Sequence, residues 1–190
     1  MPPKAKITKE MVLEAAFAVA RETGADNINA RTVAEKLGCS TQPILYHFAT
    51  IAELKRAVYA KTDWFHTEYL LRPAGPQEDP LLSIGLNYIR FAVREPHLFR
   101  LLFQSGLASE NSLPAMVDSR ELVPVLSAMQ EGMGVGPQQT KEIFLTLALF
   151  VHGYASLLAN NSLQYEEALI RHQLEKVYTG AVYAAQEESK

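Results

Sequence analysis

The sequence of 190 residues contains a single cysteine, Cys39, and none of the patterns of a β protein. One cysteine cannot form an intramolecular disulfide, and this composition suits a reducing compartment. No stretch shows a sustained two-residue alternation of apolar and polar residues, and the dipeptides of tight β-hairpins are missing. A disulfide framework is therefore excluded, and we predict an all-α fold.

The known signatures of catalysis and of metal binding are also missing. The sequence has no G-x-S-x-G, no P-loop, no nucleotide-binding glycine fingerprint and no HExxH, and it lacks a close cluster of His, Asp and Glu. We therefore predict that the protein is not an enzyme, and we expect no cofactor, no catalytic residue and no metal site. In the turn where Cys39 lies, a small buried side chain is favoured over a redox sensor.

The sequence shows little that would place it in a membrane. Residues 1–8 lack the apolar stretch of a secretory signal. The longest apolar stretch, residues 143–159, contains His152 and Gly153 and is shorter than the roughly 20 residues that span a bilayer. We interpret it as a buried helix and predict a cytoplasmic protein with no membrane partner.

The charge is distributed unevenly along the chain. With 48% hydrophobic and 21% charged residues the composition is that of a globular protein, and its net charge is −3. Residues 1–61 contain nine Lys/Arg and six Asp/Glu, a balance of +3, whereas residues 62–190 contain nine and fifteen, a balance of −6. This asymmetry suggests that the N-terminal third holds a polyanion, although an excess this small can also arise by chance.

Helical periodicity and end-capping residues predict about nine helices. We divide the chain into a helix-turn-helix domain, residues 1–56, and a larger helical domain for ligand binding and dimerisation, residues 57–190. The predicted helices run from Thr8 to Gly24, Asn29 to Gly38, Ser40 to Phe48, Thr50 to about Leu71, Asp79 to Glu95, a short one through Phe103, one ending near Gly132, Gly136 to about Asn160, and Ser162 towards Glu188.

The stretch CSTQPILYHF, residues 39–48, predicts the second helix of a helix-turn-helix unit. With Ser40 as the N-cap, Pro43 falls in the first helical turn, where its missing N–H costs nothing. The start of this second helix reads base edges in the major groove, and Gln42 is a suitable partner for adenine. The alternative for Thr41 and Gln42 is an ordinary solvated helix start.

Two further local patterns follow in the same region. Ile44 and Phe48 lie four residues apart on one helix face and are predicted to be core residues, whereas Leu45 could belong to either face. Residues 50–53, TIAE, predict a capping box at the start of the next helix.

Four short patterns in the same region resemble one known family. They are NARTVA (residues 29–34), LGCS (37–40), YHF (46–48) and EL (53–54). On these, the segment from Thr8 to Tyr59 resembles the DNA-binding domain of the tetracycline-repressor (TetR) family of transcriptional regulators. The patterns in residues 88–103 and 150–158 resemble a subgroup with a His-Gly pair in the C-terminal domain. The resemblance implies a homodimer that binds a palindromic operator and is released by a small-molecule effector.

The resemblance also implies which residues contact DNA. Family members read bases from the positions of Thr41, Gln42 and Pro43, and hold phosphates from those of Arg31, Leu45 and Ile51. Leu45 and Ile51 replace the usual tyrosine and lysine, and neither can pair with a phosphate. Our hypothesis is that nearby side chains replace the two lost contacts, namely those of Tyr46, His47, Thr50 and Lys55. The full predicted DNA-binding set is Arg31, Thr32, Ser40, Thr41, Gln42, Pro43, Tyr46, His47, Thr50 and Lys55.

Aromatic residues of the acidic part predict a small-molecule pocket, with a filled core as the alternative for each residue. Arg90 and Arg94, four residues apart on one helix face, are candidates for a ligand's carboxylate or phosphate, unless they are solvated or paired with neighbours such as Glu95. The predicted pocket residues are Trp64, Phe65, Tyr69, Tyr88, Phe91, Arg94, Phe99, Phe103 and His152.

The helix from Pro137 to Asn160 is apolar on nearly all sides, which predicts partners on all sides. We expect it to form a four-helix bundle with the last helix across a two-fold axis. The predicted dimer residues are Leu145, Leu149, His152, Gly153, Ser156, Leu174, Val177 and Tyr178. The recognition helices would then lie about 34 Å apart, as successive major grooves do.

Three functions are compatible with these patterns. The favoured one is a ligand-responsive regulator, with repression as the expected effect, whose partners are operator DNA, a second copy of the chain and a small molecule. The alternatives are an all-α small-molecule-binding or enzyme module, and a protein-interaction module, in which the N-terminal cluster does not bind DNA. The sequence identifies neither the operator nor the effector.

Overall fold

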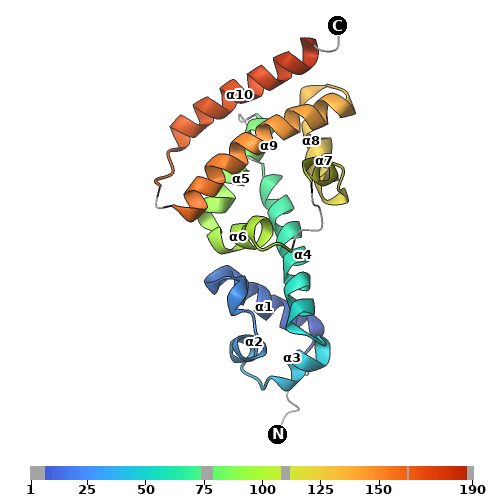
Figure 1. The fold of residues 1–190 in the computed structure, drawn as a ribbon, viewed down its shortest axis with the longest axis vertical. Helices are drawn as coiled ribbons and strands as arrows, with labels where there is room; N and C mark the ends of the chain where they lie inside the picture. Colours follow the sequence, from blue (N-terminus) through green and yellow to red (C-terminus); the bar gives the residue numbers. More distant parts are fainter. Residues whose placement is uncertain (1–6, 74–78, 108–111, 162, 188–190) are drawn as a thin grey trace. The chain divides into compact units, whose positions relative to one another are not determined.

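The computed structural model of the chain describes residues 7–73, 79–107, 112–161 and 163–187. Within these ranges the chain forms ten α-helices and two short 3-10 helices and contains no strand, which confirms the all-α prediction (Figure 1). The contacts divide the chain into two compact units, one of Met1–Asp63 with His97–Ala108 and one of Trp64–Pro96 with Ser109–Lys190. The functional division at residues 56 and 57 stays a prediction.

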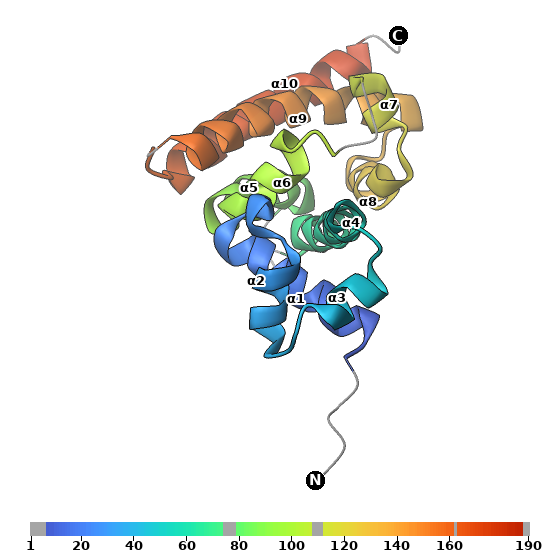
Figure 2. The same cartoon turned by 60° about the horizontal axis from the view of Figure 1, so that its bottom comes forward.

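The first unit contains four helices near the N-terminus and most of a later one. They are α1 (Lys9–Thr23), α2 (Ala30–Leu37), α3 (Gln42–His47), the first part of α4 (Ile51–Leu70) and α6 (Pro96–Gln104), with the 3-10 helix η1 (Ala25–Asn27) after α1. The core of α1 is Val12, Ala15, Ala16, Val19 and Ala20, and α6 buries Leu98, Phe99, Leu101 and Leu102. Figure 2 shows the same helices from below.

Several predicted helix ends are confirmed by their hydrogen bonds. The Thr8 hydroxyl oxygen accepts a bond from the Met11 N–H at 3.2 Å and so caps α1. Gly38 ends α2 with a left-handed backbone, φ 63°, which glycine adopts without a steric cost. Asp79 caps α5 (Pro80–Arg94) by accepting the Leu81 N–H at 2.8 Å.

The predicted N-cap of α3 is wrong by one residue. α3 begins at Gln42, its N-cap is Thr41, and no side chain makes a capping hydrogen bond there. Had Ser40 been the N-cap, the third helical residue would be Pro43, which has no N–H for the serine hydroxyl to bind. Pro43 still lies within the first turn, so the prediction that it starts the helix rather than breaks it is confirmed.

Two predicted helices of the second unit differ from the structure. The helix predicted to end near Gly132 is divided into α7 (Leu113–Val117), the 3-10 helix η2 (Arg120–Leu122) and α8 (Val123–Met133), because Pro124 is accepted only in a first turn. The last helix, α10 (Glu167–Glu187), begins after the non-helical residues 163–166, so the cap predicted at Ser162 is wrong. Ser162 itself lies outside the described residues, as do residues 74–77 of the predicted loop after α4.

The second unit is built around α9 (Pro137–Asn160), which packs against α5, α8 and α10. One buried cluster joins α4, α5, α8, α9 and α10, and consists of Leu70, Leu81, Val125, Met129, Ile143 and Ala185. Where α5 packs against α10, Gly85 leaves room for the buried side chain of Leu174.

Charged and polar side chains join α5 to α4 and to α10 in this unit. The Asn87 amide donates to the carbonyl oxygens of Leu70 and Arg72 at 3.1 and 3.0 Å, which closes the end of α4. Arg90 pairs with Glu167 at the start of α10, and this pairing lowers the pKa of the Glu167 carboxyl below its ordinary value. These bonds hold α4 and α10 against α5.

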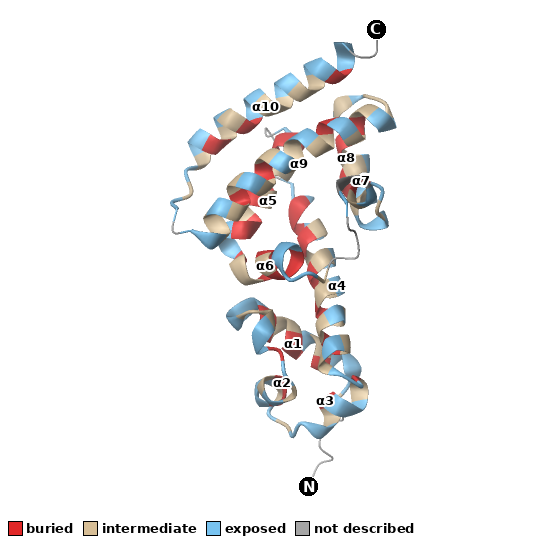
Figure 3. Ribbon diagram, viewed as in Figure 1, coloured by how far each residue is buried: buried red, intermediate tan, exposed pale blue. Residues whose placement is uncertain are grey.

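In the single chain α9 is buried on one side only, so the prediction that a second subunit covers the rest is not tested and stays a prediction. α9 buries Thr140, Ile143, Val151 and Ala155, while much of its remaining surface is open (Figure 3). By length and composition it is the one helix of the described chain apolar enough to cross a membrane, which is weak evidence because helices buried in soluble proteins pass the same test.

The close approach of α5 and α10 is testable at Gly85. A Cβ at this position would lie 2.7 Å from Leu174 Cδ2 and 3.5 Å from Val151 Cγ1. We expect Gly85→Ala to lower the free energy of unfolding, because overpacking costs about 1–3 kcal/mol and outweighs the gain in helix propensity of about 1 kcal/mol. Urea unfolding of Gly85→Ala, Leu174→Val and the double variant measures the effect. If Gly85→Ala lowered the free energy of unfolding equally in the wild type and in the Leu174→Val variant, the contact between the two positions would be contradicted.

Candidate functional site

Two buried side chains hold α3 on the first unit and decide which of its faces is open. Ile44 and Phe48, four residues apart, are fully buried, which confirms their predicted place in the core. The opposite face presents Gln42, Leu45 and Tyr46, and the Tyr46 ring is 79% exposed. Leu45, which the sequence could place on either face, lies on the open one.

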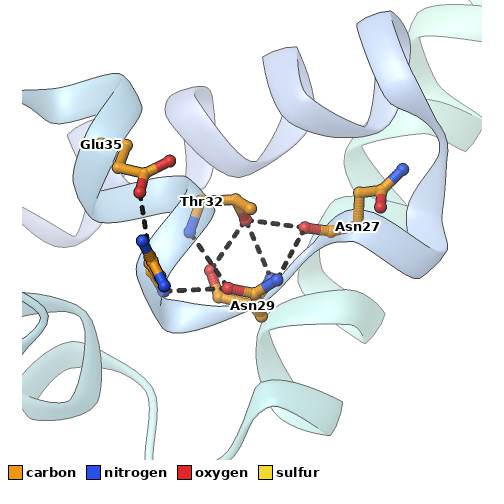
Figure 4. Close-up of polar contacts among 5 residues, drawn as sticks. Asn27, Asn29, Thr32 and Glu35 are labelled. Atoms are coloured by element: carbon orange, nitrogen blue, oxygen red, sulfur yellow. Dashed lines mark hydrogen bonds and ion pairs between the residues drawn. The ribbon is translucent and has the colours of Figure 1, made fainter.

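The start of α2 is held by a network of hydrogen bonds, drawn in Figure 4. Asn29 Oδ1 accepts the N–H groups of Arg31 and Thr32, both at 3.0 Å. The Thr32 hydroxyl accepts the Asn29 N–H at 3.2 Å and donates to the Asn27 carbonyl at 2.6 Å. The Thr32 hydroxyl is thus used inside a capping box, where it positions α2.

Arg31, in the first turn of α2, is paired with a neighbour one turn away. Its Nε lies 3.1 Å from Glu35 Oε1, and both side chains are largely exposed. Exposed pairs of this kind contribute little to stability, so Arg31 can exchange Glu35 for another anion at low cost.

The segment between α3 and α4 is bound to the beginning of the chain. His47 Nε2 donates to the Ile7 carbonyl at 2.9 Å, and its ring contacts the Tyr46 ring edge to face. The Thr50 hydroxyl accepts the Glu53 N–H at 3.1 Å, as the predicted capping box requires. The Glu53 side chain, however, does not complete the capping box as predicted: its Oε2 accepts the N–H of Ala49 at 3.0 Å, whereas a capping box uses the N–H of Thr50.

All ten predicted DNA-binding residues lie in the first unit, on or beside α2, α3 and the start of α4. Their degree of exposure separates them into two groups. Exposed are Arg31, Ser40, Thr41, Gln42, Tyr46 and Thr50; partly buried are Thr32, Pro43, His47 and Lys55.

In the second unit, aromatic rings from three helices gather in one cluster, which we call the ring cluster. It contains Phe65, His66 and Tyr69 from α4, Tyr88 and Phe91 from α5, and His152 from α9. The centroids of the His66 and Phe91 rings are 4.7 Å apart, and the Tyr88 hydroxyl lies 2.8 Å from His152 Nδ1. Five of the nine predicted pocket residues therefore belong to this cluster, in which His66 connects Tyr88 to Phe91.

The other four predicted pocket residues lie apart from the ring cluster. Trp64 is 60% exposed and Arg94 is also exposed. Phe99 and Phe103 form a ring pair, 4.9 Å between centroids, in the first unit. The sequence showed that these residues are aromatic or basic, but not which faces of their helices turn inward.

His66 is the one member of the ring cluster that the sequence-based prediction missed. Thr62, His66 and Tyr69 are all buried and follow one another at intervals of four and three residues, as one face of a helix does. This periodicity was visible in the sequence, and it would have placed His66 beside Tyr69.

Burial makes the polar members of the ring cluster electrically neutral. It lowers the pKa of His66 to about 3 and also lowers that of His152, while it raises the pKa of Tyr88 above its ordinary value. Within the described parts of the chain, no three His, Cys, Asp or Glu side chains are grouped to hold a metal. The ring cluster is suited to contact apolar rings and neutral hydrogen-bonding groups.

Comparison with known proteins gives a family match and a shared fold. The family model for the tetracyclin repressor-like C-terminal domain matches residues 81–177, just over half of the chain. A TetR-family member from Streptomyces coelicolor A3 is 19% identical, with a TM-score of 0.55 over 89% of this chain and 96% of that one. The multidrug-binding protein EbrR, in complex with ethidium, is 18% identical, with a TM-score of 0.54 over 93% and 99%. No curated protein matches the sequence significantly.

The buried His66 predicts a specific pH dependence of stability. Its pKa is about 3 in the folded chain against 6.5 for a model histidine, so the unfolded state binds the proton first as the pH falls. We expect this group to reduce the free energy of unfolding by about 2 kcal/mol between pH 7 and pH 5, with a continuing loss towards pH 3. Between pH 7 and pH 5, the free energy of unfolding of His66→Phe should therefore fall by about 2 kcal/mol less than that of the wild type. Urea unfolding at both pH values measures this difference. The exposed His172, changed to Phe, is the matched control; an unchanged pH dependence in His66→Phe would contradict the prediction.

Proposed function

The chain belongs to the tetracycline-repressor-like family, and from this premise we propose that it is a cytoplasmic, homodimeric transcriptional regulator that binds operator DNA and responds to a small molecule. Repression, relieved by the effector, is the proposed effect. No catalytic step is part of the proposal.

The observation that carries this proposal is the open face of α3. Burial of Ile44 and Phe48 leaves the Gln42 amide, with its paired donor and acceptor, directed to solvent at the first position of the helix. Thr41 and Tyr46 are exposed beside it. In a helix-turn-helix the start of the second helix contacts base edges, so Gln42 is the proposed reader of an adenine and Thr41 its neighbour.

Charged and hydroxyl groups around α3 are the proposed phosphate contacts. Arg31 is one, once DNA replaces Glu35 as its anion. Thr50 is exposed at the start of α4, and Lys55 follows one turn later. These groups would orient α3 without reading sequence, as phosphate contacts do.

The open apolar surface of α9 and α10 supports a dimer. Leu149 is 58% and Leu157 50% exposed on α9, and Leu169 and Tyr183 are exposed on α10. At Gly153 an added Cβ would meet nothing within 4 Å, so a second backbone can approach there. Of the predicted dimer residues, Leu174 instead lies inside the chain against Gly85. The proposed interface therefore uses Leu145, Leu149, His152, Gly153 and Ser156 of α9, with Val177 and Tyr178 of α10.

The ring cluster is the proposed effector site. Its side chains come from three helices of one unit, so a molecule held among them would change how α4, α5 and α9 pack. The Tyr88–His152 hydrogen bond offers neutral polar groups to orient it. The structural likeness to EbrR, which binds ethidium, is consistent with a ring-containing effector.

Separate substitutions should distinguish base reading from phosphate binding. We expect Gln42→Ala to weaken binding to a specific duplex by about 1–3 kcal/mol, roughly 5- to 150-fold, with an unchanged salt dependence. Lys55→Ala should flatten the plot of log K against log salt by about one unit while base preference is kept. Fluorescence anisotropy, at several salt concentrations, with a duplex selected by the wild-type chain from a random pool measures both. Failure of the wild type to enrich any duplex would refute the proposed function.

The proposed interface is testable by charge substitution. We expect Leu149→Lys to convert a dimer to a monomer, because a lysine in an apolar interface would be buried without a partner. Light scattering after size-exclusion chromatography gives the mass. The matched control is Val123→Lys, because Val123 is an apolar residue that is 55% exposed on α8 and lies outside the proposed interface. A monomeric wild type, or a dimeric Leu149→Lys variant, would contradict the proposal.

A further inference from the structure

Leu45 is the exposed residue of α3 to which the proposed DNA binding gives no role. Its side chain is 53% exposed, although leucine is among the residues most often buried. It has no hydrogen-bonding group, so it cannot hold a phosphate as the tyrosine usual at this position does. A single exposed leucine is ordinary on a protein surface, so its meaning depends on what lies around it.

Leu45 lies on the same face of α3 as the proposed base reader. Gln42 is three residues earlier, and side chains at this spacing are neighbours on a helix, with Cβ atoms about 5–6 Å apart. Tyr46, which is 79% exposed, follows on the same side, whereas Ile44 and Phe48 are buried on the other. The six residues of α3 include no acidic side chain that would repel DNA. The face around Leu45 is therefore open to a duplex.

The major groove offers one kind of group that suits a leucine side chain. Base edges present hydrogen-bond donors and acceptors there, and the apolar group among them is the 5-methyl of thymine. A leucine set against a polar base edge removes water from that edge and offers no hydrogen bond in return, which is unfavourable. Against a thymine methyl both surfaces are apolar, and their burial is favourable. The chemistry of the side chain thus selects thymine.

We propose that Leu45 reads the methyl group of a thymine that lies within one base pair of the adenine contacted by Gln42. The helical rise between the two residues is about 4.5 Å, and successive base pairs are about 3.4 Å apart. The two side chains therefore reach the same base pair or neighbouring ones. In place of a phosphate contact, this chain has a second point of sequence recognition at position 45. The inference rests on the proposed DNA binding.

Deoxyuridine tests the contact directly, because uracil differs from thymine only in lacking the methyl group. In the duplex selected by the wild-type chain, each thymine is replaced by deoxyuridine in turn. The adenine contacted by Gln42 is located as the one whose replacement has little further effect in Gln42→Ala. At one thymine within one base pair of it, we expect about fourfold weaker binding, the effect of losing one buried methyl-sized group. Fluorescence anisotropy gives the dissociation constants.

Substitution of Leu45 should remove this preference. Leu45→Ala should bind the thymine duplex about fourfold more weakly or worse, and should bind the thymine and uracil duplexes nearly equally. Leu45→Met keeps a long apolar side chain and should retain most of the preference. Neither variant should change the slope of log K against log salt, because leucine releases no counterions.

A control variant separates the contact at α3 from a general loss of apolar surface. Val123→Ala truncates an apolar side chain in the second unit that is 55% exposed, close to the exposure of Leu45. It should keep the wild-type affinity and the wild-type preference for thymine. Thermal unfolding followed by circular dichroism confirms that each variant is folded.

The outcomes separate this inference from the proposed function. If the wild type binds its duplex but no deoxyuridine near the adenine weakens binding, the role of Leu45 is overturned and DNA binding stands. If Leu45→Ala keeps the wild-type preference for thymine over uracil, another residue senses the methyl group, and the inference is again overturned. A wild-type chain that enriches no duplex refutes the proposed function and the inference together.

Discussion

The surface proposed to contact DNA depends on the burial of two side chains, Ile44 and Phe48. α3 has only six residues, and a helix this short does not persist in water without tertiary packing. The two apolar side chains attach it to the first unit and, since they are four residues apart, leave one face open. The orientation of Gln42 and Tyr46 is a consequence of that packing rather than of any contact they make themselves.

The parts around α3 serve to keep it in place. The Asn29–Thr32 capping box begins α2, the left-handed Gly38 ends it, and the Thr50 cap begins α4. His47 and Lys9 then join the start of the chain to this region. Most of these polar groups are used in hydrogen bonds within the chain and are not available to contact bases. The capping residues stabilise the helices, and a few exposed side chains remain for the proposed contact with DNA.

In the second unit, ring-bearing side chains from three helices pack together, and none of them carries a buried charge. His66 is kept neutral by its surroundings, and the Tyr88 hydroxyl is hydrogen-bonded to His152 Nδ1. The charged pairs of this unit, such as Arg90 with Glu167, lie nearer the surface and connect α5 with α10. An effector that separates the rings would therefore alter how the helices of the proposed dimer surface are held.

Sequence periodicity and capping chemistry by themselves determined the all-α class, most helix ends, the core role of Ile44 and Phe48, and the place of Pro43 in a first turn. These are local properties, set by neighbours within one or two turns. Only the tertiary structure decided that Leu174 faces Gly85, that Trp64 is exposed and that His47 holds Ile7. Each of these depends on residues far apart in the chain, whose contacts no local pattern records.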